Sequence, residues 1–234
     1  MSQLLASVTN VDEALIALEN GADIIDLKNP AEGALGALSL DTIRAIVDSV
    51  ARHKPLSATI GDLPMDPRLL LEAARETADT GVDIVKIGFF GREAHVECIH
   101  AMQTLTAQGA RIVAVLFADE EPDFGLLPQL EAAGFYGVML DTAIKNGKRL
   151  RHHMDNARLR FFVEEARSRN LLSGLAGSLA ITDIEDLIQL DADYLGFRGA
   201  LCASSDRKAA LDPRQLALLA DVLHSCNIMA KEFA

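Results

Sequence analysis

The sequence contains no tryptophan and only three cysteines among its 234 residues. Cys98, Cys202 and Cys226 are widely spaced, and neither a CxxC pair nor a Cys/His ligand spacing is present. A disulfide framework and a zinc site are therefore not expected, and free thiols suit a reducing, cytoplasmic compartment. No apolar run approaches the roughly 18 residues that a membrane helix needs, and the N-terminus lacks the basic segment of an export signal.

Positive charge is also scarce, with 22 Lys and Arg against 34 Asp and Glu and a net charge of −12. A field of this sign repels nucleic acid and anionic membranes, so neither is an expected partner. An anionic ligand would need a locally positive pocket. The glycine motifs of nucleotide-binding folds are missing as well, because TNVDEA follows the first predicted strand in place of GxGxxG, and no Walker loop occurs.

What the chain does contain is a recurring unit of a helical stretch, a Gly or Asp turn and a short β-branched run. Amphipathic helices are predicted over 11–21, 69–81 and 159–170. Eight strands are predicted, at Gln3 to Val8, Asp23 to Lys28, Leu56 to Gly61, Asp83 to Gly88, Arg111 to Phe117, Gly137 to Asp141, Leu172 to Gly177 and Tyr194 to Gly199.

Alternating strands and helices indicate a parallel sheet covered by helices. Eight units of roughly 29 residues fit a TIM (β/α)8 barrel that occupies residues 1–234 as a single domain. The alternative is a doubly wound open sheet, which would normally carry a glycine fingerprint after its first strand.

Charged residues stand at the end of the second predicted strand, which reads DIIDLK. Side chains alternate along a strand, so Asp26 and Lys28 share the face of Ile24 while the residues between them take the other face. In a barrel one face packs on helices and the other points inward, and the carboxyl ends of the strands carry the active site. We expect Asp26 and Lys28 to point inward at that rim.

The same alternation places Lys86, Asp141 and Arg198 at the ends of strands four, six and eight. Inward layers of such barrels come from alternate strands, so these residues are expected to converge with Asp26 and Lys28. Two interpretations stay open at this point. The carboxylates and lysines are either a functional group of residues or structural ion pairs, and an arginine at a strand end often caps a neighbouring helix.

Lysines gathered with aspartates at a barrel mouth suit imine chemistry on a small carbonyl compound. An amine attacks a carbonyl only when unprotonated, and burial or nearby cations favour that form. Lys145, shortly after the sixth strand, adds a third cation to Lys28 and Lys86. One lysine can then form a Schiff base while another accepts and returns protons, and a carboxylate supplies a further acid or base.

Small-residue turns close the last two predicted strands, LAGS after strand seven and FRGA after strand eight. Barrels of this class commonly bind phosphate with backbone N–H groups at these two places. Gly177, Ser178 and Gly199 are the candidate donors, and Arg198 is a candidate cation.

The stretches DIIDLKNPAEGALGA, SATIGDLP, VKIGFFG, MLDTAIKNGK, LAGS and GFRGALC, in this order, resemble the (5-formylfuran-3-yl)methyl phosphate synthase family. This family is also called 4-(hydroxymethyl)-2-furancarboxaldehyde phosphate synthase and serves methanofuran biosynthesis. The resemblance runs from about Leu4 to the last strand. Two positions depart from the pattern: Ser205 stands where a glycine is expected before the DR pair, and Ala34 stands where a serine is common.

The resemblance implies a TIM-barrel lyase that joins two molecules of glyceraldehyde 3-phosphate with loss of phosphate and water. It makes Lys28 the Schiff-base lysine and Lys86 the proton acceptor, and it places Asp26, Asp141 and Lys145 in the site. Periodicity alone would leave Lys145 in solvent. We expect no metal and no organic cofactor.

Two alternatives to this function remain. One is a Schiff-base aldolase of the same barrel class that acts on another phosphorylated sugar, and the other is a non-catalytic barrel that serves as a scaffold. Apolar residues on the exposed faces of the outer helices are compatible with a homo-oligomer.

Overall fold

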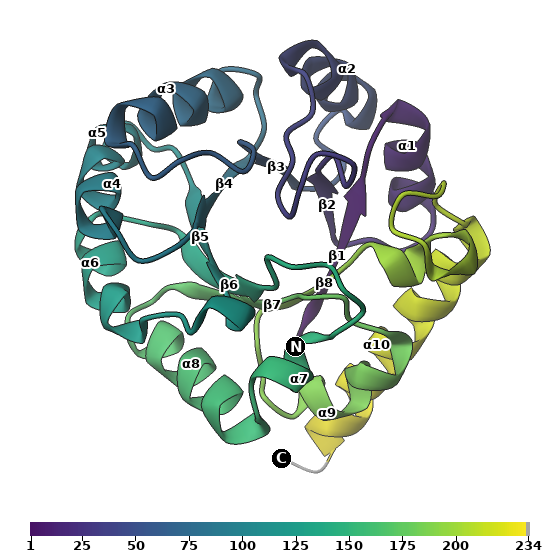
Figure 1. Cartoon of the computed structure of the whole chain (residues 1–234). Coiled ribbons are helices and arrows are strands. Elements are labelled where there is room, and N and C mark those ends of the chain that lie inside the picture. Colours follow the sequence, from purple (N-terminus) through teal and green to yellow (C-terminus); the bar gives the residue numbers. More distant parts are fainter. Residues whose placement is uncertain (233–234) are drawn as a thin grey trace.

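A computed structural model describes residues 1–232 and shows a closed ring of eight parallel strands surrounded by helices (Figure 1). The strands follow one another round the ring in chain order, and β8 pairs with β1 to close it. The predicted TIM (β/α)8 barrel is confirmed, and the alternative of an open doubly wound sheet is wrong. The strands are β1 (Gln3–Val8), β2 (Ile24–Leu27), β3 (Leu56–Thr59), β4 (Ile84–Phe89), β5 (Ile112–Phe117), β6 (Gly137–Asp141), β7 (Leu172–Leu175) and β8 (Tyr194–Phe197).

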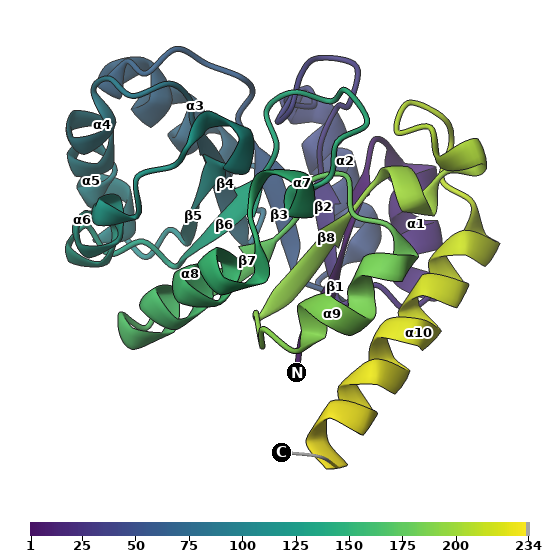
Figure 2. The same ribbon diagram turned by 60° about the horizontal axis from the view of Figure 1, so that its bottom comes forward.

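The helices lie outside the strands, and α10 runs along the outer surface beside α9 and α1 (Figure 2). The α-helices are α1 (Val11–Glu19), α2 (Leu40–Val50), α3 (Pro67–Ala78), α4 (His95–Ala101), α5 (Gln103–Thr106), α6 (Leu127–Ala132), α7 (Leu150–His153), α8 (Asn156–Ser168), α9 (Ile184–Ile188) and α10 (Pro213–Glu232). Short 3-10 turns are η1 (Ala118–Glu120), η2 (Phe124–Leu126), η3 (Ile181–Asp183), η4 (Gly199–Leu201) and η5 (Ala203–Ser205). Within residues 1–232, none of these helices has the length and apolar character needed to cross a membrane.

The three predicted helices correspond to α1, α3 and α8. Each begins after a side chain that accepts hydrogen bonds from its first turn, namely Asn10, Asp66 and Asp155. Such N-caps satisfy N–H groups that have no partner within the helix, so they define where the helix starts.

Several strands are shorter than predicted. The structure ends β2 at Leu27 and β7 at Leu175, whereas the sequence pattern carried these strands to Lys28 and Gly177. Gly177 has φ +112°, a left-handed conformation that cannot continue a strand. Lys28 and Gly177 therefore lie in the loops just beyond the carboxyl ends of their strands, where barrels place functional groups.

The alternation of side chains predicted for the second strand is confirmed by two separate apolar clusters. Ile25 and Leu27 belong to the large outer cluster, which fills the space between strands and helices. Ile24 belongs to the smaller inner cluster inside the barrel, together with residues such as Val113 and Met139. Asp26, which lies on the same face as Ile24, is fully buried inside the ring.

The loop after β2 folds over part of the barrel mouth. The carboxylate of Asp62 accepts hydrogen bonds from the N–H groups of Ala34 and Leu35, both at 2.7 Å. Leu35 belongs to the inner apolar cluster together with Phe117, whose ring stacks on Phe90 at 4.3 Å between centroids. These apolar side chains fill the mouth beside β4 and β5, so the open cavity lies toward β6, β7, β8 and β1.

Candidate active site

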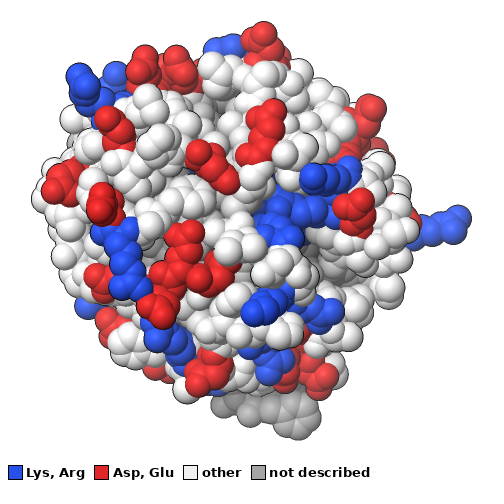
Figure 3. Space-filling view, viewed as in Figure 1, with Lys and Arg blue, Asp and Glu red and all other residues white. Residues whose placement is uncertain are grey.

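A cavity of about 370 Å³ opens at the carboxyl ends of the strands. Three acidic residues and six cationic ones line it, an excess of positive charge in a chain whose net charge is −12. The acidic residues are Asp26, Asp141 and Asp206, and the cationic ones are Lys28, Lys86, Lys145, Arg149, Arg198 and Arg207. Figure 3 shows Lys and Arg atoms gathered right of the centre of this face. Such a cavity favours an anionic ligand.

Asp26 is the centre of a hydrogen-bonded group on four neighbouring strands, β1 to β4. It lies directly between Ser7 of β1 and Ser57 of β3 in the strand register. Ser7 donates to one carboxylate oxygen at 2.9 Å, Ser57 donates to the other at 2.6 Å, and the Lys86 ammonium lies 2.7 Å from that same oxygen. Both oxygens of this fully buried carboxylate therefore have protein partners in place of water.

The pKa values of this pair are both shifted from their ordinary positions. Burial alone would raise the pKa of Asp26, but the charges of Lys86 and Lys28 outweigh it and the pKa of Asp26 is lowered. Burial lowers the pKa of Lys86, and the Asp26 carboxylate only partly opposes this shift. Lys86, with 2% of its surface exposed, therefore gives up its proton more readily than an ordinary lysine.

Asp141, the last residue of β6, lies between two lysines. The Lys145 ammonium is 2.7 Å from one carboxylate oxygen, and the Lys28 ammonium is 3.6 Å from the other. Burial would raise the pKa of Asp141, but the charges of Lys145 and Lys28 hold it well below its usual range. Asp141 therefore stays ionised between its two cations.

Lys145 turns back into the cavity from the loop after β6, where its ammonium also contacts Thr142 Oγ1 at 3.0 Å. Its side chain is 18% exposed, so the expectation from periodicity that it lies in solvent is wrong. Burial lowers the pKa of Lys145, and Asp141 partly opposes this. Lys145 lies in the cavity because of a tertiary contact. The loop reverses where the carboxylate of Asp119 accepts hydrogen bonds from the N–H groups of Ala143 and Ile144.

The turn after β7 presents backbone donors to the cavity. Residues 177–179 all line it, and within residues 1–232 their N–H groups have no protein acceptor. A side chain at Gly177 would come within 3.0 Å of Thr142, and Ser178 also has a positive φ, of 52°. This turn has the properties of an anion cradle, because consecutive free N–H groups bind phosphate oxygens.

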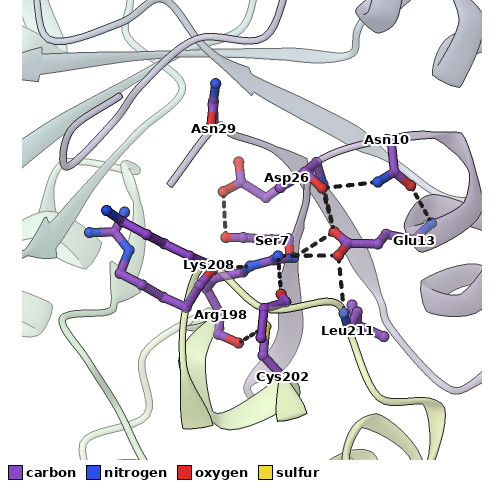
Figure 4. A network of polar contacts seen from close by, with 12 residues as sticks. Ser7, Asn10, Glu13, Asp26, Asn29, Arg198, Cys202, Lys208 and Leu211 are labelled. Carbon is purple, nitrogen blue, oxygen red and sulfur yellow. Dashed lines mark hydrogen bonds and ion pairs between the residues drawn. The ribbon is translucent and has the colours of Figure 1, made fainter. Parts of the chain in front are cut away.

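Arg198 does not supply a free cation to this cradle, which corrects the expectation from the sequence (Figure 4). Its guanidinium forms two hydrogen bonds with the carboxylate of Glu13, at 2.6 and 3.1 Å. Its other hydrogen bonds reach the carbonyl oxygens of Ser7, Arg207 and Ala209. Alternation predicted the position of Arg198 at the rim but not a buried acidic partner from α1.

The family to which the chain belongs follows from comparison with known proteins. The family model for 4-HFC-P synthase matches residues 4–220. The chain belongs to the 4-HFC-P synthase family. The resemblance drawn from the sequence motifs is thereby confirmed, and membership identifies the protein as an enzyme.

Relatives of this 4-HFC-P synthase family member align over nearly their whole length. A relative from Methylorubrum extorquens is 44% identical, covering 95% of this chain and 92% of its own. The (5-formylfuran-3-yl)methyl phosphate synthase of Methanopyrus kandleri is 37% identical over 94% of this chain and 98% of its own. Among solved structures, 3-hexulose-6-phosphate synthase from Salmonella typhimurium superposes with a TM-score of 0.70 at 18% identity, over 96% of this chain and 99% of its own. That likeness shows the barrel fold alone.

The barrel thus brings all nine predicted site residues to one cavity. Lys28, Lys86, Asp26, Asp141 and Lys145 all line it. Gly177, Ser178, Arg198 and Gly199 line it as well.

Three further residues of the site were not predicted from the sequence: Ser7 and Arg207, which line the cavity, and Ser57, which donates a hydrogen bond to Asp26. Ser7 and Ser57 were missed although they flank Asp26 in the strand register, because serine in a strand carries no chemical signal of its own. Arg207 was missed because it lies in an irregular loop, far from any strand end along the chain. No periodicity indicates where such a side chain points.

The Glu13–Arg198 ion pair gives a first prediction. Glu13→Gln should lower the free energy of unfolding by about 2–4 kcal/mol, because the buried guanidinium loses its counter-charge. Chemical denaturation at neutral pH measures this change. Burial alone would raise the pKa of Glu13, but the hydrogen bonds and positive charge of Arg198, together with the hydrogen bonds from Thr9, lower it. The carboxylate therefore stabilises the fold above the ordinary pKa of 4.5, and the difference between the two proteins should shrink as the pH falls below it.

Glu72→Gln is the matched control, since Glu72 is exposed on α3 and makes no ion pair within residues 1–232. Its free energy of unfolding should change by no more than about 0.5 kcal/mol. Equal effects of the two substitutions would contradict a stabilising role for the buried pair.

Proposed function

We propose that this 4-HFC-P synthase family member condenses two molecules of glyceraldehyde 3-phosphate into (5-formylfuran-3-yl)methyl phosphate for methanofuran biosynthesis. The reaction releases one inorganic phosphate and two molecules of water, so it involves no net oxidation or reduction. The observation that carries the proposal is the arrangement of three lysines around two buried carboxylates in a cavity with excess positive charge. That arrangement supplies both an amine for imine formation and binding energy for phosphorylated substrates.

Lys28 is the best candidate for the Schiff base. The Lys86 and Lys145 ammonium groups each lie 2.7 Å from a carboxylate oxygen, whereas Lys28 lies 3.6 Å from Asp141 and makes no side-chain hydrogen bond within residues 1–232. Its amine is thus the least engaged of the three. The amine adds to the carbonyl carbon of one triose phosphate, and loss of water gives the imine.

Lys86 is the candidate proton acceptor. It is almost fully buried, and its lowered pKa makes a neutral amine accessible nearer to neutral pH than for an ordinary lysine. Removal of a proton from the carbon next to the imine gives an enamine. That carbon then attacks the aldehyde carbon of the second triose phosphate and forms the new carbon–carbon bond.

Asp26, Asp141 and Lys145 are candidates for the later proton transfers. Elimination of phosphate, ring closure and dehydration each need a proton delivered to or removed from oxygen or carbon. Asp141 and Lys145 share a hydrogen bond at 2.7 Å, a geometry through which one proton can move. Hydrolysis of the imine returns the Lys28 amine. The N–H groups of Gly177, Ser178 and Gly199, which all line the cavity, hold a substrate phosphate.

Borohydride trapping tests the proposal directly. Reduction in the presence of glyceraldehyde 3-phosphate should add the mass of the reduced adduct at Lys28, located by peptide mass spectrometry. Borohydride without substrate is the control and should add nothing. Labelling at another residue, or none, would overturn the assignment of Lys28.

The product separates this activity from a Schiff-base aldolase acting on another sugar phosphate. Only the furan synthase yields a conjugated aldehyde that absorbs in the near ultraviolet. An adduct at Lys28 without this absorbance would therefore support the aldolase, and no turnover of any triose phosphate would support a non-catalytic barrel.

A further inference from the structure

The cations that line the cavity differ in how far the protein itself already engages them. Lys86, Lys145 and Arg198 each lie 2.7 Å or less from a carboxylate oxygen. Arg207 makes one side-chain hydrogen bond within residues 1–232, to the carbonyl oxygen of Gly33 at 2.9 Å, and no ion pair there. Since a guanidinium carries five N–H donors, Arg207 has most of its hydrogen-bonding capacity available to a ligand.

The backbone of Arg207 is held in place by the buried pair described above. Arg198 donates from Nε to the carbonyl oxygen of Arg207 itself and from a terminal nitrogen to that of Ala209, both at 2.9 Å. Glu13 in turn accepts from the N–H of Leu211 at 3.0 Å. These hydrogen bonds hold the backbone at Arg207, Ala209 and Leu211, so the loop over 199–211 is preorganised although it contains little regular structure.

The side chain of Arg207 reaches from this loop to the loop after β2. Gly33, whose carbonyl it contacts, has φ +118°, and a side chain there would lie 2.1 Å from the carboxylate of Asp62. Both attachment points are therefore fixed, one by Arg198 and the other by Asp62. Arg207 is half-buried and consequently spans the cavity mouth. Its charge contributes to lowering the pKa of Lys145 inside the cavity.

We propose that Arg207 binds the phosphate of a triose phosphate in the cavity, and that the Glu13–Arg198 pair acts as the positioning element that holds its loop. The planar guanidinium matches two phosphate oxygens, which gives direction as well as charge. Arg207 thus takes the role that the sequence suggested for Arg198. The proposal rests on the proposed function for the identity of the substrate, but the binding of inorganic phosphate tests it without any turnover.

The test compares Arg207→Gln with Arg207→Lys and with the control Lys208→Gln. Lys208 is the next residue along the chain, is exposed and does not line the cavity, so its substitution removes the same charge from the same loop. Arg207→Gln should raise the dissociation constant for inorganic phosphate, measured by calorimetry, and the KM for glyceraldehyde 3-phosphate by about tenfold or more. For Arg207→Lys, both constants should lie between those of the unaltered protein and those of Arg207→Gln, because lysine keeps the charge but not the paired donors. For Lys208→Gln, both constants should stay within about twofold of those of the unaltered protein.

Binding of phosphate and substrate by Arg207→Gln as tight as by the unaltered protein would overturn the proposal. Equal weakening by Lys208→Gln would also overturn it, since general loss of charge would then explain the effect. If circular dichroism shows that Arg207→Gln does not fold, Arg207→Lys becomes the deciding variant. An affinity of Arg207→Lys for inorganic phosphate equal to that of the unaltered protein would contradict recognition by paired guanidinium donors.

Borohydride trapping distinguishes failure of this proposal from failure of the proposed function. At saturating glyceraldehyde 3-phosphate, Arg207→Gln should still acquire an adduct at Lys28, because its loss concerns binding and not imine formation. Absence of the adduct in the unaltered protein would contradict the Schiff-base mechanism. The calorimetric measurement with inorganic phosphate would still test whether Arg207 binds phosphate.

Discussion

Lys28→Arg should lower kcat/KM for furan formation by about 10³-fold or more while the protein remains folded. Arginine keeps the positive charge beside Asp141, so the electrostatics of the cavity change little. It offers no primary amine, however, and cannot form the imine through which the proposed reaction passes. Spectroscopic detection of the furan aldehyde measures the rate, and an unaltered circular dichroism spectrum shows that the fold survives.

Lys54→Arg is the matched control for this substitution. Lys54 precedes β3, pairs with Asp23 at 3.8 Å and does not line the cavity. Its replacement should leave kcat/KM within about twofold and the borohydride adduct at Lys28 intact. Substantial furan synthesis by Lys28→Arg would mean that another lysine carries the imine.

Asp26→Asn should lower the free energy of unfolding by about 3–5 kcal/mol near neutral pH. The substitution removes the only carboxylate within 4 Å of the Lys86 ammonium among the described residues and leaves that cation buried. Denaturation at several pH values measures the change. The loss should diminish as the pH rises, because Lys86 then becomes neutral in the folded variant and no longer needs a partner.

The pH dependence of activity gives the same substitution a second readout. If Lys86 accepts the proton, kcat/KM rises as Lys86 loses its own proton, at a pH below the ordinary lysine value of 10.5. Asp26 raises the pKa of Lys86, so its removal lowers that pKa further and should move this rise to lower pH. The plateau should also fall, by about 10²-fold, because a proton-transfer group is lost.

Asp41→Asn provides the control for Asp26→Asn. Asp41 pairs with Arg44 on the exposed side of α2, where ion pairs contribute little. Neither its free energy of unfolding nor the pH profile should change measurably. A rise of activity that moves to higher pH in Asp26→Asn would argue against Lys86 as the acceptor.

How far the site was predictable depends on the range of the interaction that places each residue. Asp26, Lys86 and Asp141 lie inside the ring because side chains alternate along every strand, a local property that sequence displays directly. The partners within the site depend instead on the register between strands. Asp26 pairs with Lys86 from β4 and not with Lys28, its neighbour along the chain.

Loops were the least predictable part of the molecule. Side-chain alternation did not place Lys145 in the site, since its position depends on how Asp119 holds the turn after β6. Arg207 appeared in the sequence only as part of the DR pair of the family pattern, and nothing there indicated that its side chain lines the cavity.

The sequence by itself determined the eight βα units, the inward faces of the even strands and the family to which the chain belongs. Hydrophobic periodicity and short motifs are local, and they survive without any knowledge of distant contacts. Only the tertiary structure decided the role of Arg198, because its carboxylate partner Glu13 lies 185 residues away along the chain. A buried cation must find a counter-charge somewhere, and which one it finds depends on the closure of the barrel between β8 and β1.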